Sequence, residues 1–365
     1  MSPNEQLVLD KVNARRKIIA WWLITVAILV ALMIVLGGAT RLTRSGLSMV
    51  DWKPLSRFLP PLSHSEWVKE FERYKRFPEY KLIHKHFTLA DFKKIYAFEF
   101  SHRALGRLIG IVYGAPFLIF SVMGWFSLRE IFKYGFGFLL GAFQGIVGWY
   151  MVKSGLSSIP SVSHYRLAFH LFMAFVLLGY LLWIIADELR VPPYAGKRRK
   201  VVRGLVYALM AVLLVQLVFG AFVAGKRAGF VYNTFPLMNG RLIPDELFLL
   251  KPAYMNFLEN GVTIQFVHRA IAFLMALIIA LIVLVVPYRS LSNKLKALYL
   301  LLPAVFVVQF ILGVSVILYQ VPLGFALAHQ FGAEALFSVV VIVSYTLSKR
   351  ASSKRARHTG ANTLI

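Results

Sequence analysis

The sequence Glu99-Phe100-Ser101-His102-Arg103 opens an apolar run that extends to Phe126, and a related sequence, Gln265-Phe266-Val267-His268-Arg269, opens another. Each run is long enough for a membrane-spanning helix, which needs about 20 apolar residues. A histidine and an arginine therefore stand at the start of two predicted spans. Because ionisable groups inside a span are costly to bury, they usually mark a functional site. The two copies differ in one respect: the first begins with a carboxylate and the second with a neutral amide.

The composition is that of a membrane protein. Of the 365 residues, 58% are hydrophobic, against about 45–50% in soluble domains. The net charge is +25, but the basic residues concentrate between the apolar runs, which is typical of charges that flank spans. We therefore expect contact with membrane lipid and no nucleic-acid partner. The absence of cysteine excludes disulfides, thiolate metal sites and covalently attached c-type haem.

Eight apolar runs predict eight transmembrane helices. They lie near residues 18–38, 97–125, 132–152, 164–186, 203–224, 263–286, 296–318 and 323–347. The first run is too long for a signal-peptide core, so we expect a retained span. The N-terminus, the tail and the short connections after the second, fourth and sixth runs are basic, and the positive-inside rule places them all in the cytoplasm. Without a long Arg- and Ser-rich leader, the expected location is a bacterial inner membrane.

The long connection between the first two runs, roughly residues 41–96, falls on the outer side. Ser63 and Glu66 have the spacing of a helix capping box. Aromatic residues then alternate with charged ones, which predicts a helix on the membrane surface. Two interpretations stay open: a plain interfacial helix, or a lid over a site that opens on the outer face.

The two halves of the chain repeat each other. Three residues recur at a constant offset of 183: Gly37, Arg44 and Gly46 match Gly220, Arg227 and Gly229. Gln144 and Gly148 likewise match Gln309 and Gly313. Each repeat has four spans, an even number, so both halves have the same orientation. We predict an all-α integral membrane protein whose eight transmembrane helices form two pseudo-symmetric four-helix bundles as parallel repeats, residues 1–190 and 191–365.

Four of the nine histidines lie just inside predicted spans, at similar depth near the periplasmic face. They are His102, His170, His268 and His329, which open the second, fourth, sixth and eighth spans. Within each half, two helices of the same direction can present one imidazole each, as the axial ligands of a b-type haem iron. Zinc would need further ligands close by. A single such histidine is more often a core residue, but two repeated pairs favour haem.

The remaining histidines fall in loops, at a span end or in the tail. They are His64, His84, His86, His164 and His358, which we expect to be solvated, with His164 set apart because it lies near the outer end of the fourth span. Six glycines at close spacing in the second and third spans are Gly106, Gly110, Gly114, Gly141, Gly145 and Gly148. They either let helices approach or clear space for a macrocycle.

Glu99 gives the two predicted haem sites different tasks. It precedes His102 by three residues and so lies one turn outward on the same helix face, whereas the second half has Gln265 there. One site would be reactive and the other would relay electrons. The alternative is that Glu99 sits at the interface near Lys93 and Lys94.

Three other charged residues in the spans have two interpretations each. Arg103 and Arg269 either extend to the interface or pair with haem propionates, for which Arg41, Arg44 and Arg166 are weaker candidates. Glu334 lies deeper than His329, and it is either protonated and silent or a proton-transfer group.

The chain resembles the haem A synthases of the type found in alphaproteobacteria and mitochondria. The motifs that carry the resemblance are Gly37 to Pro54, Phe71 to Lys81, Glu99 to Arg103, Tyr165 to Leu171, Asn233 to Gly240, Gln265 to Arg269 and His329-Gln330. They cover nearly the whole chain in order. Another branch of the family carries a cysteine pair in the outer loop, which this chain lacks.

The resemblance implies oxidation of a methyl group of haem O to a formyl group, giving haem A for terminal oxidases. It implies that the substrate haem lies between His102 and His170, that a resident haem b lies between His268 and His329, and that Glu99 is the catalytic acid. It further implies that haem O synthase delivers the substrate and that an electron-transfer partner exists. The oligomeric state stays open, a homo-oligomer included.

Two other classes of function stay open on the residues alone. One is a non-catalytic dihaem electron carrier linked to quinone, which equivalent acids in both halves, or in neither, would have favoured. The other is a transporter with parallel repeats whose histidines relay protons.

Overall fold

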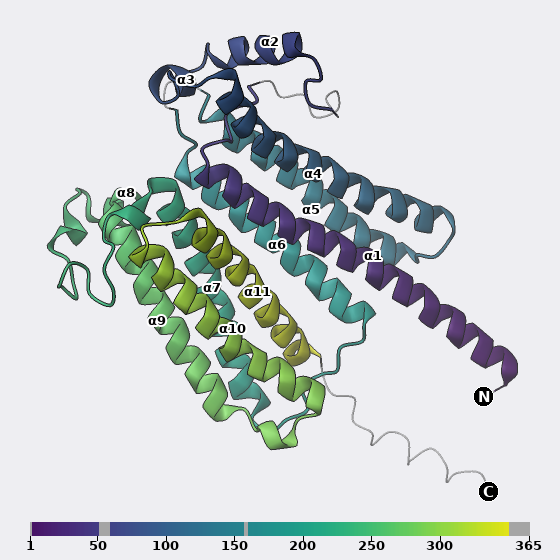
Figure 1. Ribbon diagram of the computed structural model, residues 1–365. Helices are drawn as coiled ribbons and strands as arrows, with labels where there is room; N and C mark the ends of the chain where they lie inside the picture. The colour runs from purple at the N-terminus through teal and green to yellow at the C-terminus, as the bar shows by residue number, and fades with distance from the viewer. Residues whose placement is uncertain (1, 51–58, 157–159, 350–365) are drawn as a thin grey trace, which may run out of the picture.

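The computed structural model describes residues 2–50, 59–156 and 160–349, and within these ranges all the extended regular elements are helices (Figure 1). Eight are long and apolar enough to cross a membrane: α1 (Pro3–Leu42), α4 (Leu89–Val122), α5 (Leu128–Lys153), α6 (His164–Glu188), α7 (Arg199–Lys226), α9 (Gly261–Val285), α10 (Asn293–Leu318) and α11 (Leu323–Ser348). The all-α membrane fold and its eight spans are therefore confirmed. The motif residues Asp51 to Pro54 and the tail beyond Lys349, with His358, lie outside the described residues.

The short helices lie in the connections. They are α2 (His64–Tyr74), α3 (Pro78–Leu82), η1 (Ala228–Phe230), η2 (Asp245–Phe248), η3 (Ala253–Met255), α8 (Asn256–Glu259) and η4 (Tyr288–Ser290). The predicted capping box is present at the start of α2, where Ser63 accepts from the backbone of Glu66 and Glu66 accepts from that of Ser63. Thr88 and Asp91 form another capping box, so α4 begins at Leu89, earlier in the chain than the predicted start at residue 97.

The helices form two neighbouring groups. Figure 1 shows α1, α4, α5 and α6 on one side and α7, α9, α10 and α11 on the other. Across the junction, α6 packs against α7 and α11, and α1 packs against α11. Leu23, Leu181, Leu209 and Val340 are fully buried in one continuous hydrophobic core that spans both groups. The division at residue 190 and the pseudo-symmetry of the halves stay predictions.

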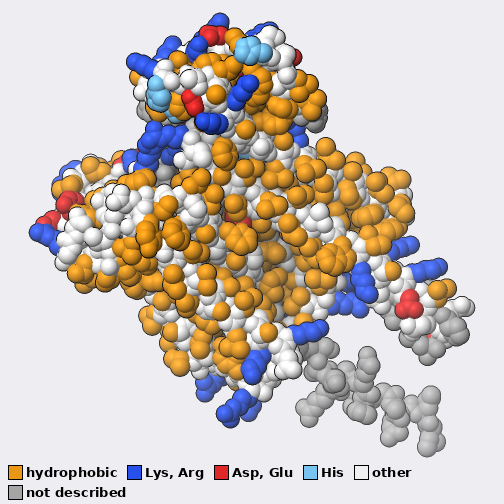
Figure 2. Space-filling model, viewed as in Figure 1, with side chains coloured by type: hydrophobic (Ala, Val, Ile, Leu, Met, Phe, Trp, Pro, Cys, Tyr) orange, Lys and Arg blue, Asp and Glu red, His pale blue; other side chains and the backbone are white. Residues whose placement is uncertain are grey.

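The outer surfaces of the helices are apolar. Val122 is 89% exposed and Leu284 is 77% exposed, and hydrophobic side chains cover the sides of the helices in the face that Figure 2 shows, with Lys and Arg at the ends. Such exposure is unfavourable in water but suits contact with lipid. The surface agrees with the spans derived from length and composition.

An ion-pair cluster joins four spans at the inner end of α6. Glu188 accepts hydrogen bonds from Lys133 Nζ at 2.7 Å and Tyr134 Oη at 2.8 Å, and Arg16 Nε lies 3.4 Å from its other oxygen. Asp187 beside it accepts from Lys133, Tyr345 and Lys349. These contacts connect α6 to α1, α5 and the end of α11. The Glu188 side chain is only 5% exposed, so its loss leaves the buried Tyr134 hydroxyl without its acceptor and Lys133 with Asp187 alone.

We expect Glu188→Ala to lower the free energy of unfolding by about 2 kcal/mol, because it removes the buried acceptor of the Lys133 and Tyr134 hydrogen bonds. Thermal or denaturant unfolding in detergent measures it. The matched control is Glu72→Ala, which removes the exposed Glu72–Lys75 pair and should cost less than about 1 kcal/mol. Equal costs for the two variants would contradict a stabilising role of the cluster.

Candidate functional site

The four span histidines come together in two pairs. His102 of α4 and His170 of α6 lie close enough for their charges to affect each other, and so do His268 of α9 and His329 of α11. All four side chains are half-buried. The structure thus pairs the imidazoles within each half, as the repeat predicts.

Each imidazole packs edge-on against a glycine of a neighbouring helix. A Cβ atom added at the glycine would lie 3.2 Å from the ring for Gly37 and His102, 3.0 Å for Gly148 and His170, 3.3 Å for Gly220 and His268, and 2.8 Å for Gly313 and His329. Those distances are shorter than ordinary van der Waals contact, so a larger residue would displace the ring. The glycines therefore fix where the imidazoles lie. Sequence comparison of the halves had matched these glycines without revealing what they contact.

Glutamines on neighbouring helices bind the backbone of the histidine helices. Gln144 Nε2 donates to the carbonyl of His170 at 2.8 Å, and Gln216 Nε2 donates to that of His268 at 3.0 Å. The ring of His329 is 3.2 Å from the carbonyl of Gln309. These bonds hold the histidine-bearing turns at a set depth.

Three of the four imidazoles keep an unused nitrogen. Nδ1 of His102, His170 and His268 is buried and has no hydrogen-bond partner among the described residues. A buried polar atom without a partner costs about 1–3 kcal/mol, so an apolar bundle retains one chiefly where a ligand or water completes the site. Paired neutral imidazoles with spare nitrogens fit an iron porphyrin, whose iron takes one imidazole on each face.

The glycines of α4 and α5 divide into two kinds. A Cβ at Gly106 would lie 3.1 Å from Met33, and one at Gly114 would lie 3.1 Å from Phe138, so these two permit close packing. At Gly110, Gly141 and Gly145 it would meet nothing within 4 Å. The last three therefore do not serve helix packing among the described residues.

Glu99 is buried, 3% exposed, and is fully engaged by its surroundings. Its Oε2 accepts from the Ser48 hydroxyl and from the Met49 N–H, both at 2.7 Å, and Arg103 donates to Oε1 at 2.5 Å. Arg103 also donates to the Met49 carbonyl at 2.7 Å. The segment that follows α1 thus holds the carboxylate in place beside His102.

The alternative neighbours proposed for Glu99 are engaged elsewhere. Lys94 pairs with Asp91 at 3.2 Å, and Lys93 lies over the ring of Trp67. The idea that Glu99 sits at the interface beside these lysines is therefore wrong. Its cationic partner is Arg103, which shares its helix and its depth.

The second half has a corresponding arrangement in which the hydrogen-bond donor and acceptor are exchanged. Gln265 Nε2 donates to the carbonyl of Tyr232 at 3.0 Å, and Arg269 donates to the carbonyls of Tyr232 and Thr234. Tyr232 lies 183 residues after Met49, the offset of the repeat. Where the first half presents an N–H to a carboxylate, the second presents a carbonyl to an amide.

The arginines suggested as propionate ligands already bind the protein. Arg41 donates to the carbonyl of Gly225 at 3.0 Å and so joins the end of α1 to the end of α7. Arg166 donates to the carbonyl of Tyr150 and lies 3.8 Å from its ring centroid. Arg269 is only 8% exposed and is held by the carbonyls of Tyr232 and Thr234.

Two of the remaining histidines differ from a solvated residue. His84 is 5% exposed and bonds to Tyr74, so the prediction that it is solvated is wrong; the outer connection folds over it. His164 lies 2.9 Å from the carbonyl of Leu258 and joins α6 to the segment before α9. His64 and His86 are exposed, as expected.

Glu334 lies on the stripe of α11 that faces the other half. Gln330, one turn away, donates to the Ile34 carbonyl of α1 at 2.5 Å, and Phe337 packs edge-to-face on Phe175 of α6. Glu334 is 2% exposed, and neither carboxyl oxygen has a partner among the described residues. Both interpretations of this residue stay open.

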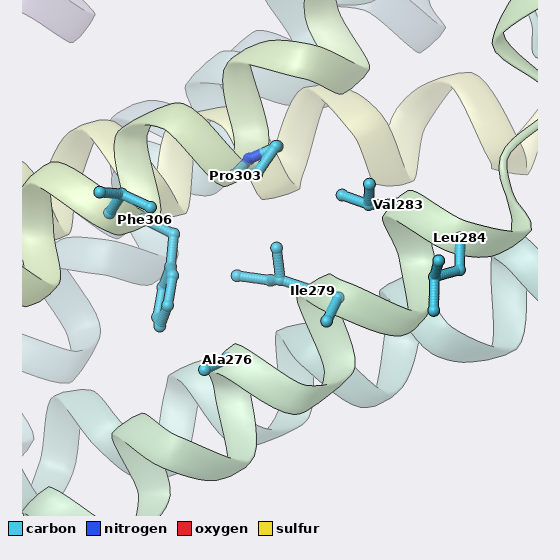
Figure 3. A pocket seen from close by; sticks show the side chains of 8 residues that line it. Ala276, Ile279, Val283, Leu284, Pro303 and Phe306 are labelled. Carbon is cyan, nitrogen blue, oxygen red and sulfur yellow. The ribbon is translucent and has the colours of Figure 1, made fainter.

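A groove between α9 and α10 has no polar lining and lies away from the imidazoles. Its volume is about 390 Å³, and it is lined by Ala276, Ile279, Ala280, Val283, Leu284, Pro303, Phe306 and Val307 (Figure 3). Ala276 is eight residues beyond His268 along α9, or about 12 Å at 1.5 Å per residue. Such a groove suits lipid chains. In the described ranges, no three His, Asp or Glu side chains converge as a metal site would require.

Comparison with known proteins identifies the family. A sequence model of the COX15-CtaA family, described as cytochrome oxidase assembly protein, matches residues 20–341. The chain belongs to this family. It is 42% identical to a protein named "Heme A synthase" from Parvibaculum lavamentivorans over 347 residues, which cover 93% of this chain and 97% of the relative. It is 43% identical over 344 residues to a protein of the same name from Nitrosospira multiformis, covering 93% and 96%.

Membership of the COX15-CtaA family agrees with the resemblance inferred from the motifs, and the lack of cysteine fits the cysteine-free branch. Sequence reasoning missed the contacts of Ser48 and Met49 with Glu99, although both lie inside a recognised motif. A signal was present, because the motif continues past the end of the first span. The sequence of this stretch does not indicate which backbone atom would meet which carboxylate.

We expect Gly220→Leu to displace the His268 ring and to lower the haem bound per purified chain at least about threefold, since a loss of only about 1.4 kcal/mol is tenfold in affinity. Absorption spectra normalised to protein measure it. Gly204→Leu on the same helix is the control, because a Cβ at Gly204 meets nothing within 4 Å. Unchanged haem content in the Gly220 variant would contradict the packing role.

Proposed function

We propose that this protein is a haem A synthase, which oxidises a methyl group of haem O to a formyl group and so gives haem A for terminal oxidases. The observation that carries the proposal is the contrast between Glu99 and Gln265 beside two similar histidine pairs. Relatives named "Heme A synthase", which this chain matches along nearly their whole length, support it. An electron carrier has no need for an acid beside only one of its two sites.

Each half takes one haem in this proposal. His102 and His170 hold the iron of the substrate haem O, and His268 and His329 hold the iron of a resident haem b. When bound, haem b supplies one-electron transfer. The unpartnered imidazole nitrogens and the glycine contacts support these assignments.

Glu99 is the proposed catalytic residue. Two hydrogen-bond donors and the Arg103 guanidinium surround its carboxylate. A fixed negative charge one turn outward from His102 can stabilise positive charge that develops at the methyl carbon, or it can accept a proton from an attacking water. Arg103, which contacts both Glu99 and the Met49 carbonyl, positions the carboxylate. The proposal also includes pairing of Arg103 or Arg269 with the haem propionates.

The proposed setting follows from the distribution of charge. The protein lies in a bacterial inner membrane with both termini in the cytoplasm and both haem sites near the periplasmic side. The eight apolar helices support a multi-pass arrangement, and α1 begins on the side where α11 ends (Figure 1). Haem O synthase is the proposed source of substrate, and a separate protein or quinone accepts the electrons.

Glu99→Gln keeps the size of the side chain but removes its charge. We expect haem A formation to fall at least about 100-fold, the usual contribution of a positioned acid or base, while bound haem is retained. Pigment extraction and chromatography after co-expression with a haem O source measure both quantities. Asp91→Asn, on the exposed outer turn of the same helix, should change neither.

Normal haem A yield in the Glu99 variant would refute the role of this residue. A wild-type protein that binds haem but forms no haem A would instead indicate the dihaem carrier, and one that binds no haem would indicate the transporter.

The histidine pairs should differ in their effect on the resident haem. In cells without a haem O source, we expect His268→Ala and His329→Ala to lose the bound haem, and His102→Ala and His170→Ala to keep it, because only the second pair holds a resident cofactor. Quantitative haem assay on purified protein measures this. Equal losses from both pairs would contradict the division of labour between the halves.

A further inference from the structure

We call the part of the connection between α1 and α4 that contains α2 and α3 the outer cap. Three buried polar side chains form a hydrogen-bonded chain in it. The Tyr74 hydroxyl lies 3.0 Å from Oε2 of Glu79 and 2.7 Å from Nδ1 of His84. Tyr74 is 0% exposed, and Glu79 and His84 are each 5% exposed. The phenol therefore connects a carboxyl group to an imidazole, with both hydrogen bonds shielded from water.

Aromatic packing fixes this chain in place. Tyr74 stacks on Phe92 of α4 with ring centroids 5.2 Å apart, and His84 stacks on Phe87 at 3.9 Å. The backbone N–H of His84 also donates to the carbonyl of Glu79 at 3.1 Å. The cap holds the three groups rigidly, so the geometry of the chain does not depend on solvent.

The chain lies over the part of the first half that contains Glu99. The charge of Glu99 affects both Glu79 and Tyr74, and Arg41 and Arg44 at the end of α1 are close enough to affect Glu79. Around His84, the nearby charged or titratable groups are Arg44 and His86. Tyr74 also packs in one hydrophobic cluster with Met49, whose N–H binds Glu99, so the chain lies near that carboxylate.

The second half has no such chain among its described residues. There Tyr232 donates to Glu246 at 2.8 Å, but both are half-exposed, and neither bonds to an imidazole. The buried chain therefore occurs in the half that has an acid beside the histidine pair. Because the chain and Glu99 occur in the same half, we relate the chain to the reaction and not to the general stability of the fold.

We propose that Glu79, Tyr74 and His84 carry protons between the Glu99 site and the outer face of the protein. The inference rests on the proposed function. When a C–H bond of the methyl group is broken by oxidation, its two electrons pass one at a time to a one-electron acceptor, and its proton remains. A buried site needs a path for that proton, and the structure provides a chain that begins near Glu99.

The transfer along the chain conserves protons. Ionised Glu79 takes up a proton, through a bridging water because the structure records no direct bond from Glu99 to Glu79. Neutral Glu79 then donates to the Tyr74 oxygen while Tyr74 passes its hydroxyl proton to Nδ1 of His84. The imidazolium then releases its Nε2 proton to water. Exchange of the remaining proton from Nδ1 to Nε2 by way of water, with rotation of the Tyr74 hydroxyl back toward Nδ1, restores the starting state.

The pKa values of Glu79 and His84, at the two ends of the chain, suit proton transfer. Burial raises the pKa of Glu79 to about 7, against an opposing effect of the Tyr74 hydrogen bond. Burial and Arg44 lower the pKa of His84, which favours release of the proton. Burial also raises the pKa of Tyr74, so the phenol stays protonated and acts only as a bridge.

Infrared difference spectroscopy of the purified protein tests the chain without turnover. We expect a protonated-carboxyl band that disappears as the pH rises through about 7. The band should be lost in Glu79→Gln and shifted in Tyr74→Phe, and it should persist in Glu70→Gln, which alters another buried carboxylate of the cap. A band that is unchanged in both chain variants would overturn the proposal.

Turnover supplies the second test. A proton acceptor acts in its ionised form, so haem A formation should increase as the pH rises through about 7 in the wild type. Glu79→Gln and Tyr74→Phe should lose that increase and fall at least about tenfold. Tyr80→Phe is the control, because the Tyr80 hydroxyl donates to the Lys85 carbonyl outside the chain.

The two proposals fail in different ways. If the wild type forms haem A and both chain variants behave as Tyr80→Phe does, the proton path is wrong and the proposed function stands. If the wild type forms no haem A, the proposed function is wrong, whatever the infrared titration shows.

Discussion

The contact between each span histidine and a glycine of the adjacent helix sets the geometry of the site. The four rings lie against Gly37, Gly148, Gly220 and Gly313 at distances that exclude a larger side chain. Because packed interiors leave little room for adjustment, this contact limits where each imidazole can lie. The glutamine bonds to the backbone of His170 and His268 act beside it.

A single change of chemistry separates the two halves. Glu99 accepts the N–H of Met49, and Gln265 donates to the carbonyl of Tyr232, so the local backbone is adapted to a charge in one half and to a neutral amide in the other. An unpartnered carboxylate is costly to bury, and Glu99 has three partners in Ser48, Met49 and Arg103.

The outer cap adds to this difference between the halves. It packs on the outward extension of α4 through Phe71, Tyr74 and Phe92, and so encloses Glu79 and His84 above the end of α1. The inner face has the opposite character: Asp187 and Glu188 hold four helices with cations from three of them. The buried Glu79–Tyr74–His84 chain and the Asp187–Glu188 ion pairs therefore lie at different ends of the helices.

The sequence by itself determined the eight spans, the four span histidines and the unequal pair Glu99 and Gln265, because hydrophobic length and internal repetition are properties of the chain alone. It also determined the family, through motifs that keep their order. Only the tertiary structure decided that Ser48 and Met49 hold Glu99, that Arg41 binds the end of α7, and that His84 is buried beside Tyr74 and Glu79. Each of these contacts joins segments that are separated in the chain or that meet in an irregular connection, where no periodicity indicates which atoms will face each other.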